Sequence, residues 1–148
     1  MTTSKFKTAD PGSFFSRMLS AEAPRPAVHA LLGSTIESVD TDTGLLRIRY
    51  EARPDFGNPA GTVQGGMLAA MLDDLTASLV DATLVAGQGV ATLSLQVSFL
   101  RAARIGTPIS GEARMQRRGR DICHVTGLLL QNGTEIASAV SVCKIVAI

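Results

Sequence analysis

The sequence predicts an α+β domain in which an antiparallel sheet wraps around one long central helix. Residues 65–85 place apolar side chains on nearly every face of a helix, which is typical of a buried helix. One segment with a strand pattern precedes this helix and four follow it. Because those strands have to cover a single buried helix, the sheet has to curl around it. The 148 residues suffice for one such domain.

The N-terminal part is expected to differ from the rest of the chain. Residues 1–33 would form a tail with short helices, and residues 34–148 the main domain. Residues 1–12 show no periodic pattern, as in a frayed terminus. Ser13 is suited to cap a short helix that two prolines would end, and a second short helix is expected at residues 27–32.

Strand patterns lie on both sides of the long helix. Over residues 46–51 apolar and charged residues alternate, and the Pro, Gly and Asn residues of 53–61 then indicate an ordered loop that leads into the helix. The clearest alternation covers residues 92–99. There the apolar side chains of Leu93, Leu95, Val97 and Phe99 would face one way, and those of Thr92, Ser94, Gln96 and Ser98 the other.

Three more strands are expected in the C-terminal third, at residues 108–117, 122–130 and 135–146. A short turn joins the first two. The Asn132-Gly133 pair predicts a tight hairpin between the second and the third. This order makes neighbouring strands antiparallel.

The composition excludes several classes of partner. The 14 Lys and Arg residues against 13 Asp and Glu give a net charge of +1, without the basic excess that nucleic-acid binding needs. Charged residues reach only 18%, against about 25% in an average soluble domain, which indicates a homo-oligomer. Cys123 and Cys143 lack the spacing of a zinc site or a disulfide scaffold. No apolar stretch approaches about 18 residues, so we expect a cytoplasmic protein without membrane contact.

Two adjacent acidic residues, Asp73 and Asp74, lie in the middle of the predicted buried helix. An ionised carboxylate there is costly unless it is hydrogen-bonded, paired or faces a cavity. The residues one helical turn from Asp73 are small, so another backbone or a ligand could come close to it. At this point either a structural hydrogen bond or a catalytic role would explain the carboxylate.

The helix begins with Gly65 and Gly66. The N–H groups at a helix N-terminus can hold an oxyanion, and a glycine there lets a substrate carbonyl approach closely. Two glycines before a helix also occur as a simple packing solution in a tight loop, so this pair is weak evidence alone.

The combination is more specific. The segment Asn58-Pro-Ala-Gly-Thr-Val-Gln-Gly-Gly-Met-Leu-Ala-Ala-Met-Leu-Asp73 resembles the hotdog-fold acyl-CoA thioesterases of the PaaI-like, phenylacetate-degradation group. That group carries N-x-x-G-x-x-H-G-G followed by a helical Asp. The resemblance extends from about residue 46 to the end of the chain. It implies a hotdog fold and hydrolysis of an aryl- or medium-chain acyl-CoA to the free acid and CoA.

The resemblance also implies roles for individual residues. Asp73 would be the nucleophile or general base, and the N–H of Gly65 would polarise the thioester carbonyl. Asn58 would position the substrate or the attacking water, and Thr92 would orient that water or the carboxylate. Gln64 stands where the family has His, so this position keeps amide donors and an acceptor but cannot act as a base.

The substrate would bring coenzyme A to the site, and neither a metal nor a separate cofactor is expected. Guanidinium groups pair well with the phosphates of coenzyme A. We expect these contacts from Arg101 and from the turn that contains Arg118, Gly119 and Arg120.

The spacing of the two main site residues predicts a shared site. Gly65 and Asp73 are eight residues apart, which is roughly 12 Å along one helix, so within one subunit they cannot both contact the same carbonyl group. If both act on one thioester, two helices have to lie antiparallel across a two-fold axis. We therefore expect a homodimer, and a homotetramer built from it.

Two other functions stay open. A non-catalytic acyl-CoA-binding hotdog protein would keep the pocket but lack turnover because of the change from His to Gln64. A hotdog hydratase or dehydratase would need a His base, but neither His29 nor His124 falls in a matching motif. The same two histidines also lack the neighbours of a triad hydrolase.

Overall fold

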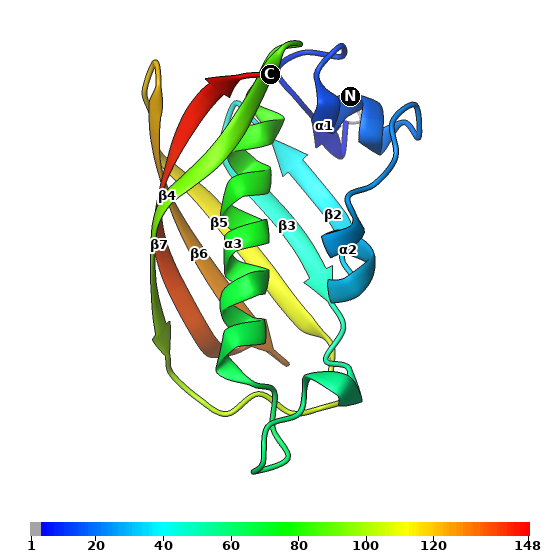
Figure 1. The fold of residues 1–148 in the computed structure, drawn as a ribbon, viewed down its shortest axis with the longest axis vertical. Helices are drawn as coiled ribbons and strands as arrows, with labels where there is room; N and C mark the ends of the chain where they lie inside the picture. Colours follow the sequence, from blue (N-terminus) through cyan, green and yellow to red (C-terminus); the bar gives the residue numbers. More distant parts are fainter. Residues whose placement is uncertain (1–3) are drawn as a thin grey trace.

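The computed structural model of the protein describes residues 4–148 and shows a seven-stranded sheet wrapped around one long helix (Figure 1). The strands are β1 (Phe6–Lys7), β2 (Thr35–Asp40), β3 (Leu45–Tyr50), β4 (Gln88–Phe99), β5 (Ile109–Arg118), β6 (Ile122–Gln131) and β7 (Thr134–Ala147). The helices are α1 (Phe14–Leu19), α2 (Ala27–Leu32), the single 3-10 turn η1 (Pro54–Phe56) and α3 (Gly65–Ala82). The spatial order is β1-β2-β3-β5-β6-β7-β4, and within the described part of the chain only β1 and β2 pair in parallel.

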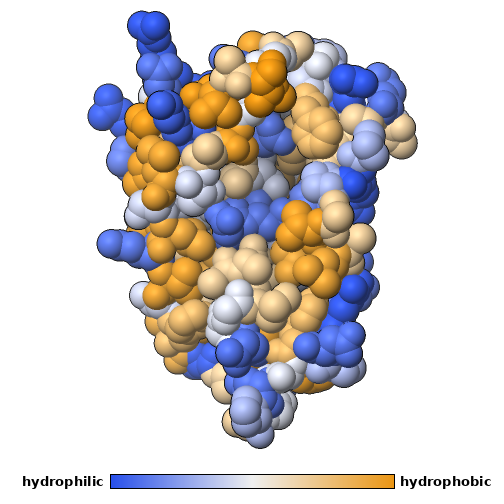
Figure 2. Space-filling view, in the orientation of Figure 1, coloured by the Kyte–Doolittle hydropathy of each residue, from blue (hydrophilic) through white to orange (hydrophobic). Residues whose placement is uncertain are grey.

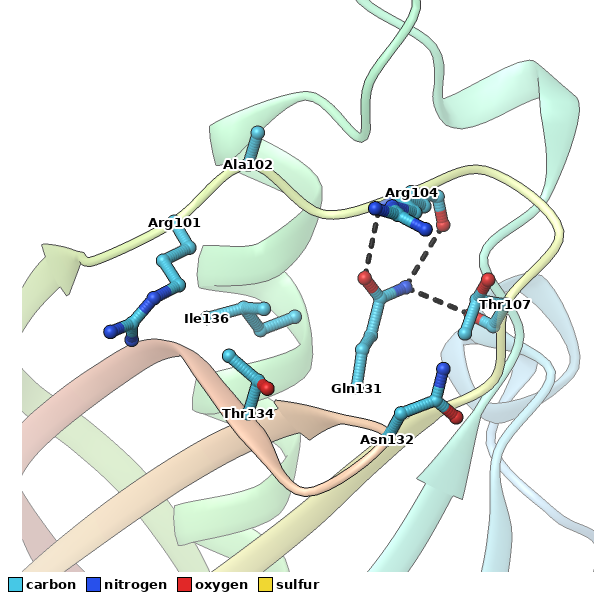
Figure 3. Close-up of a pocket in the computed structure, with 8 residues that line it drawn as sticks. All are labelled: Arg101, Ala102, Arg104, Thr107, Gln131, Asn132, Thr134 and Ile136. Atoms are coloured by element: carbon cyan, nitrogen blue, oxygen red, sulfur yellow. Dashed lines mark hydrogen bonds between the residues drawn. The ribbon is translucent and has the colours of Figure 1, made fainter.

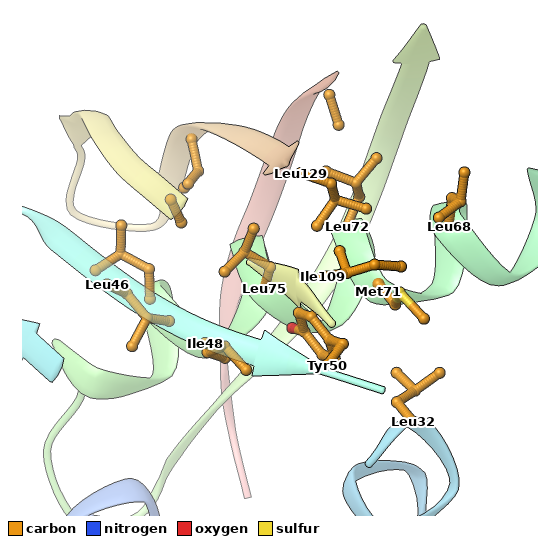
Figure 4. Close-up of a cluster of buried hydrophobic side chains, with 14 of the residues drawn as sticks. Leu32, Leu46, Ile48, Tyr50, Leu68, Met71, Leu72, Leu75, Ile109 and Leu129 are labelled. Carbon is orange, nitrogen blue, oxygen red and sulfur yellow. The ribbon is translucent and has the colours of Figure 1, made fainter. Parts of the chain in front are cut away.

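The core lies between α3 and the concave face of the sheet (Figure 4). Leu68, Leu72 and Leu75 of α3 are buried against apolar residues of the central strands. Glycines on those strands let the helix approach closely. A Cβ atom at Gly127 would lie 3.0 Å from a methyl carbon of Thr76, so a larger residue there would push the helix away from the sheet.

The short helices lie where the sequence predicts them. Ser13 caps α1, since its side chain accepts a hydrogen bond from the N–H of Ser16. Helix α2 covers the predicted residues 27–32 and ends at Gly33, whose φ of 60° is the left-handed conformation that glycine adopts easily.

Helix α3 differs from the prediction in two ways. It ends at Ala82 and not at Val85. In addition, it is not buried all round, because Ala69, Ala70 and Asp73 are only half-buried. Asp73 faces the edge strand β4, where the hydroxyl of Thr92 bonds to it. Within residues 4–148 no helix has the length and hydropathy needed to cross a membrane.

Two strands are absent from the sequence prediction. A register shift between Ile36 and Ser38 breaks the alternation of β2, so the segment lacks a clear period of two. Strand β1 has only two residues, paired with Val39 and Asp40, and is too short to show a period. The prediction of a frayed tail is therefore wrong for these two residues.

A bulge also changes the predicted faces of β4. The register with β7 shifts between Thr92 and Ser94. As a result Thr92 bonds to Asp73 of the central helix, and Leu95 packs against the same core, although simple alternation puts Thr92 and Leu95 on opposite faces. Leu93, expected beside Leu95, is 57% exposed.

Asp81 is a titratable group that weakens the fold at neutral pH. Burial raises the pKa of Asp81 from 3.8 to about 6, and nearby His29 offsets only part of this effect. Asp81 also lies in the last turn of α3, where the helix dipole disfavours a negative charge and no basic residue compensates for it.

Asp81→Asn should raise the free energy of unfolding at neutral pH by about 2 kcal/mol. A carboxyl whose pKa is higher in the folded protein favours folding most below its unfolded pKa of 3.8, and this contribution is lost as the pH rises to about 6. The gain should therefore vanish below pH 3.8. Urea titrations across this pH range would measure it, with the exposed Asp121→Asn as the matched control. If Asp81→Asn raised the free energy of unfolding equally at every pH, the raised pKa of Asp81 would not be the cause of the effect.

Candidate active site

Asp73 lies on the half-buried side of α3, next to β4. The hydroxyl of Thr92 donates a hydrogen bond of 2.7 Å to Asp73 Oδ1. Among residues 4–148, no donor is bonded to the other carboxylate oxygen, Oδ2. One oxygen is thus held in place while the second is available for chemistry.

The neighbouring Asp74 has a structural role. Its carboxylate accepts a hydrogen bond of 2.8 Å from the Tyr50 hydroxyl, and its Oδ1 lies 2.9 Å from His29 Nε2 in an ion-pair contact. The Asp74 side chain is only 6% exposed. Burial, together with the charge of Asp74, raises the pKa of Tyr50 well above its usual value, so the phenol stays a neutral donor. The network joins α2 and β3 to α3. Asp74 and Asp73 therefore have different roles in the structure.

The N-terminus of α3 is formed by Gln64, Gly65 and Gly66. The backbone carbonyl of Gln64 accepts hydrogen bonds from the N–H groups of Met67 and Leu68, and its side chain is exposed. The Gln64 side chain makes no capping bond, so its amide remains available on the surface.

Asn58 shapes the loop before the helix. Its Oδ1 accepts hydrogen bonds from the N–H groups of Ala60 and Thr62, both at 3.0 Å, and its Nδ2 donates to Thr62 Oγ1 at 2.9 Å. Gly61 within this loop has a φ of 79°, which favours glycine. The sequence resemblance assigns Asn58 to substrate or water, whereas its bonds within one chain hold the loop that leads to Gly65.

A hollow of about 380 Å³ opens beside the N-terminus of α3. Asn58, Gly65, Leu68, Phe99 and Arg101 all contribute to its lining. The structure thus brings together three of the residues that the sequence analysis singled out. Phe99 was treated there only as an apolar strand residue, because nothing in its pattern separates it from Leu95 or Val97.

Arg101 also borders a second hollow of about 260 Å³, between the loop after β4 and the β6–β7 hairpin (Figure 3). Gln131 fixes the two walls: its Oε1 accepts from the N–H of Arg104, and its Nε2 donates to the carbonyls of Arg104 and Thr107, all at 2.9 Å. Arg101 itself donates to the carbonyl of Glu135.

The predicted turn residues lie at the other end of α3. Arg118 Nε donates to the hydroxyl of Thr83, just after the helix. A Cβ atom at Gly119 would lie 2.3 Å from the carbonyl oxygen of Ile122, so only glycine fits there. The side chain of Arg120 is 95% exposed. Within one chain, Arg118 and Arg120 are therefore separated from Arg101 by the length of the central helix.

Comparison with known proteins identifies the family. A model of the thioesterase superfamily matches residues 60–137, and the chain belongs to that superfamily. The fold predicted from the sequence, a hotdog fold, is confirmed. No curated protein matches the chain.

Solved structures give the same result. A phenylacetic acid degradation-related protein from Ralstonia eutropha JMP134 is 52% identical, with a TM-score of 0.87, over 89% of this chain and 99% of that one. The PaaI protein from the phenylacetic acid degradation operon of E. coli is 16% identical, with a TM-score of 0.79, over 90% and 94%. A hypothetical thioesterase protein with coenzyme A from Streptococcus pneumoniae TIGR4 is 17% identical, with a TM-score of 0.70, over 77% and 86%.

Tyr50→Phe should lower the free energy of unfolding by about 2 kcal/mol, because it removes the hydrogen bond that Tyr50 donates to the buried Asp74 carboxylate. Thr92→Val is the matched control, since it removes a hydroxyl from the other aspartate at an exposed position and should change stability by less than about 0.5 kcal/mol. Denaturant titration measures both variants. Equal effects would show that the two aspartates do not differ in their structural role.

Proposed function

We propose that the protein hydrolyses an aryl- or medium-chain acyl-CoA to the free acid and CoA. Membership in the thioesterase superfamily gives the class of reaction. The observation that carries the proposal is the state of Asp73, which is held by Thr92 through one oxygen while the other has no donor among residues 4–148. A half-buried carboxylate in this state can act on a carbonyl carbon or on a water molecule.

Asp73 can act by two routes. In one, its oxygen bonds to the thioester carbonyl carbon, the carbon–sulfur bond breaks, and water then hydrolyses the anhydride. In the other, Asp73 takes a proton from water as that water attacks. In both routes the CoA thiolate leaves and takes up a proton. The N–H of Gly65 would stabilise the developing oxyanion, by roughly 3 to 4 kcal/mol for such a donor in other enzymes.

A dimer would complete the site. Gly65 and Asp73 lie roughly 12 Å apart along α3, so Gly65 of one subunit has to work with the partner's Asp73. Strand β4 is an edge of the sheet and carries the exposed side chains of Leu93 and Phe99, which favours pairing with a second copy. Figure 2 shows the side of the molecule on which α3 is seen in Figure 1. On this side hydrophobic residues lie on both sides of a central hydrophilic patch. A homotetramer remains part of the proposal.

Coenzyme A would be held through its phosphates. The Streptococcus pneumoniae relative was solved with coenzyme A. In this chain Arg101 stands beside the hollow next to Gly65, and Arg118 with Arg120 lies at the far end of the helix. In the proposed dimer the two α3 helices are antiparallel, so the two arginine groups would come from different subunits. The exposed amide of Gln64 would orient the substrate carbonyl in place of the family's His.

A non-catalytic acyl-CoA binder is the second candidate, and Gln64 is the observation that favours it. Measuring both saturable binding and release of CoA thiol separates the two candidates. Binding without turnover across aryl and aliphatic acyl-CoAs would establish the binder.

Asp73→Asn should lower kcat by about a thousand-fold, since an amide neither attacks the thioester nor accepts a proton from water. Asp81→Asn makes the same change on the same helix, away from the site, and should retain wild-type kcat. Release of free CoA thiol measures both variants, and size-exclusion chromatography checks that both keep the wild-type assembly. Near-normal turnover by Asp73→Asn would remove the catalytic assignment.

Subunit mixing tests the shared site. Gly65→Pro removes the N–H at the first position of α3, and Asp73→Asn removes the carboxylate. Neither variant alone should turn over substrate. After exchange in equal amounts, half of the dimers are mixed and each has one intact site, so about a quarter of the wild-type activity should return. No recovery, with subunit exchange demonstrated, would mean that each site lies within one subunit.

A further inference from the structure

The ring of Phe99 rests on the first residue of the central helix. A Cβ atom built on Gly65 would lie 3.2 Å from Phe99 Cε1 and from Cζ, and 3.6 Å from Cε2. The free edge of the ring thus occupies the space that a side chain at Gly65 would need. The same construction at Gly66 meets nothing within 4 Å. Of the two glycines, only Gly65 is required by this contact.

Phe99 is nevertheless 56% exposed, so most of its ring has no partner within the chain. It borders the hollow of about 380 Å³ that also contains Gly65. The amide nitrogen of Gly65 and the Cβ position that the ring touches are bonded to the same Cα atom. A carbonyl bound to the N–H of Gly65 would therefore lie close to the ring.

The chemistry around the ring indicates which part of the substrate meets it. The lining of the hollow is mixed: Val63, Leu68, Leu100 and Ala103 supply apolar groups, and Asn58, Thr62 and Arg101 supply polar ones. The amide of Asn58 is already bonded within its loop. On the exposed face of the Phe99 ring, the amides of the pantetheine arm of CoA would lose hydrogen bonds to water, whereas an apolar acyl group would lose none.

We propose that Phe99 is a specificity-determining residue, whose ring packs against the acyl group when the thioester carbonyl is bound to the N–H of Gly65. The inference rests on the proposed function and adds a residue that selects the substrate. Contact between two aromatic rings stabilises a complex by more free energy than the burial of their apolar area alone. Phe99 therefore favours a flat aryl group over a flexible chain of equal carbon number.

The test compares benzoyl-CoA with heptanoyl-CoA, which have the same number of acyl carbons. Phe99→Leu keeps an apolar side chain but removes the ring. It should lower kcat/KM for benzoyl-CoA about five-fold and leave that for heptanoyl-CoA within about two-fold. Phe14→Leu makes the same substitution at an exposed position of α1 and should not change the ratio between the two substrates.

The contact between the ring and Gly65 supplies a second test. Gly65→Ala displaces the ring and should shift the substrate ratio in the same direction as Phe99→Leu. The shift should vanish when Gly65→Ala is made in a Phe99→Ala background, because no ring is left to displace. Gly66→Ala is the matched control, since its Cβ meets nothing within 4 Å. Equal losses for both substrates would overturn the inference and leave thioester hydrolysis intact.

A third experiment measures the binding of non-hydrolysable analogues of benzoyl-CoA and heptanoyl-CoA, which carry a methylene between the carbonyl and the sulfur. If the wild type binds these analogues but releases no thiol from the thioesters, the proposed function fails. The ratio of the two dissociation constants then tests Phe99, with the same five-fold shift expected. If neither analogue binds, both the function and the role of Phe99 are overturned.

Discussion

The structure depends on how one helix accommodates two adjacent carboxylates. Consecutive residues on a helix point about 100° apart, so Asp73 and Asp74 cannot share one environment. Asp74 turns toward α2 and β3, where Tyr50 and His29 satisfy it in a nearly closed site. Asp73 turns toward β4, where Thr92 is the only residue among 4–148 that bonds to its carboxylate. The buried network therefore sets the rotation of α3, and that rotation presents Asp73 on the open side.

Much of the fold could be predicted from the sequence, because the strongest patterns come from burial. The long helix, the capped α1 and the strands β3 to β7 all have a clear period or a turn signal. The elements that were missed lack such a signal. Strand β2 has a bulge, and β1 is too short, so both depend on pairing with a neighbour and not on their own composition.

The candidate site was predicted less evenly. The resemblance selected Asp73 and Gly65, but the sequence alone could not distinguish Asp73 from Asp74, since the partners of Asp74 lie 24 and 45 residues away along the chain. It could not place Thr92 either, because the bulge in β4 reverses the face on which that side chain lies. Long-range contacts and local irregularities of this kind leave no period in the sequence.

In the proposed dimer, strand β4 would serve both the site and the assembly. Strand β4 contacts the helix at Thr92 and again at Phe99, so it borders both Asp73 and Gly65. It is also the edge of the sheet, and it carries exposed apolar side chains that water solvates poorly. A second copy that covers this edge would bury those side chains and close the space around the helix N-terminus. In that arrangement the pairing of two subunits would also exclude water from the thioester. The low fraction of charged residues in the chain fits a surface that a second copy buries.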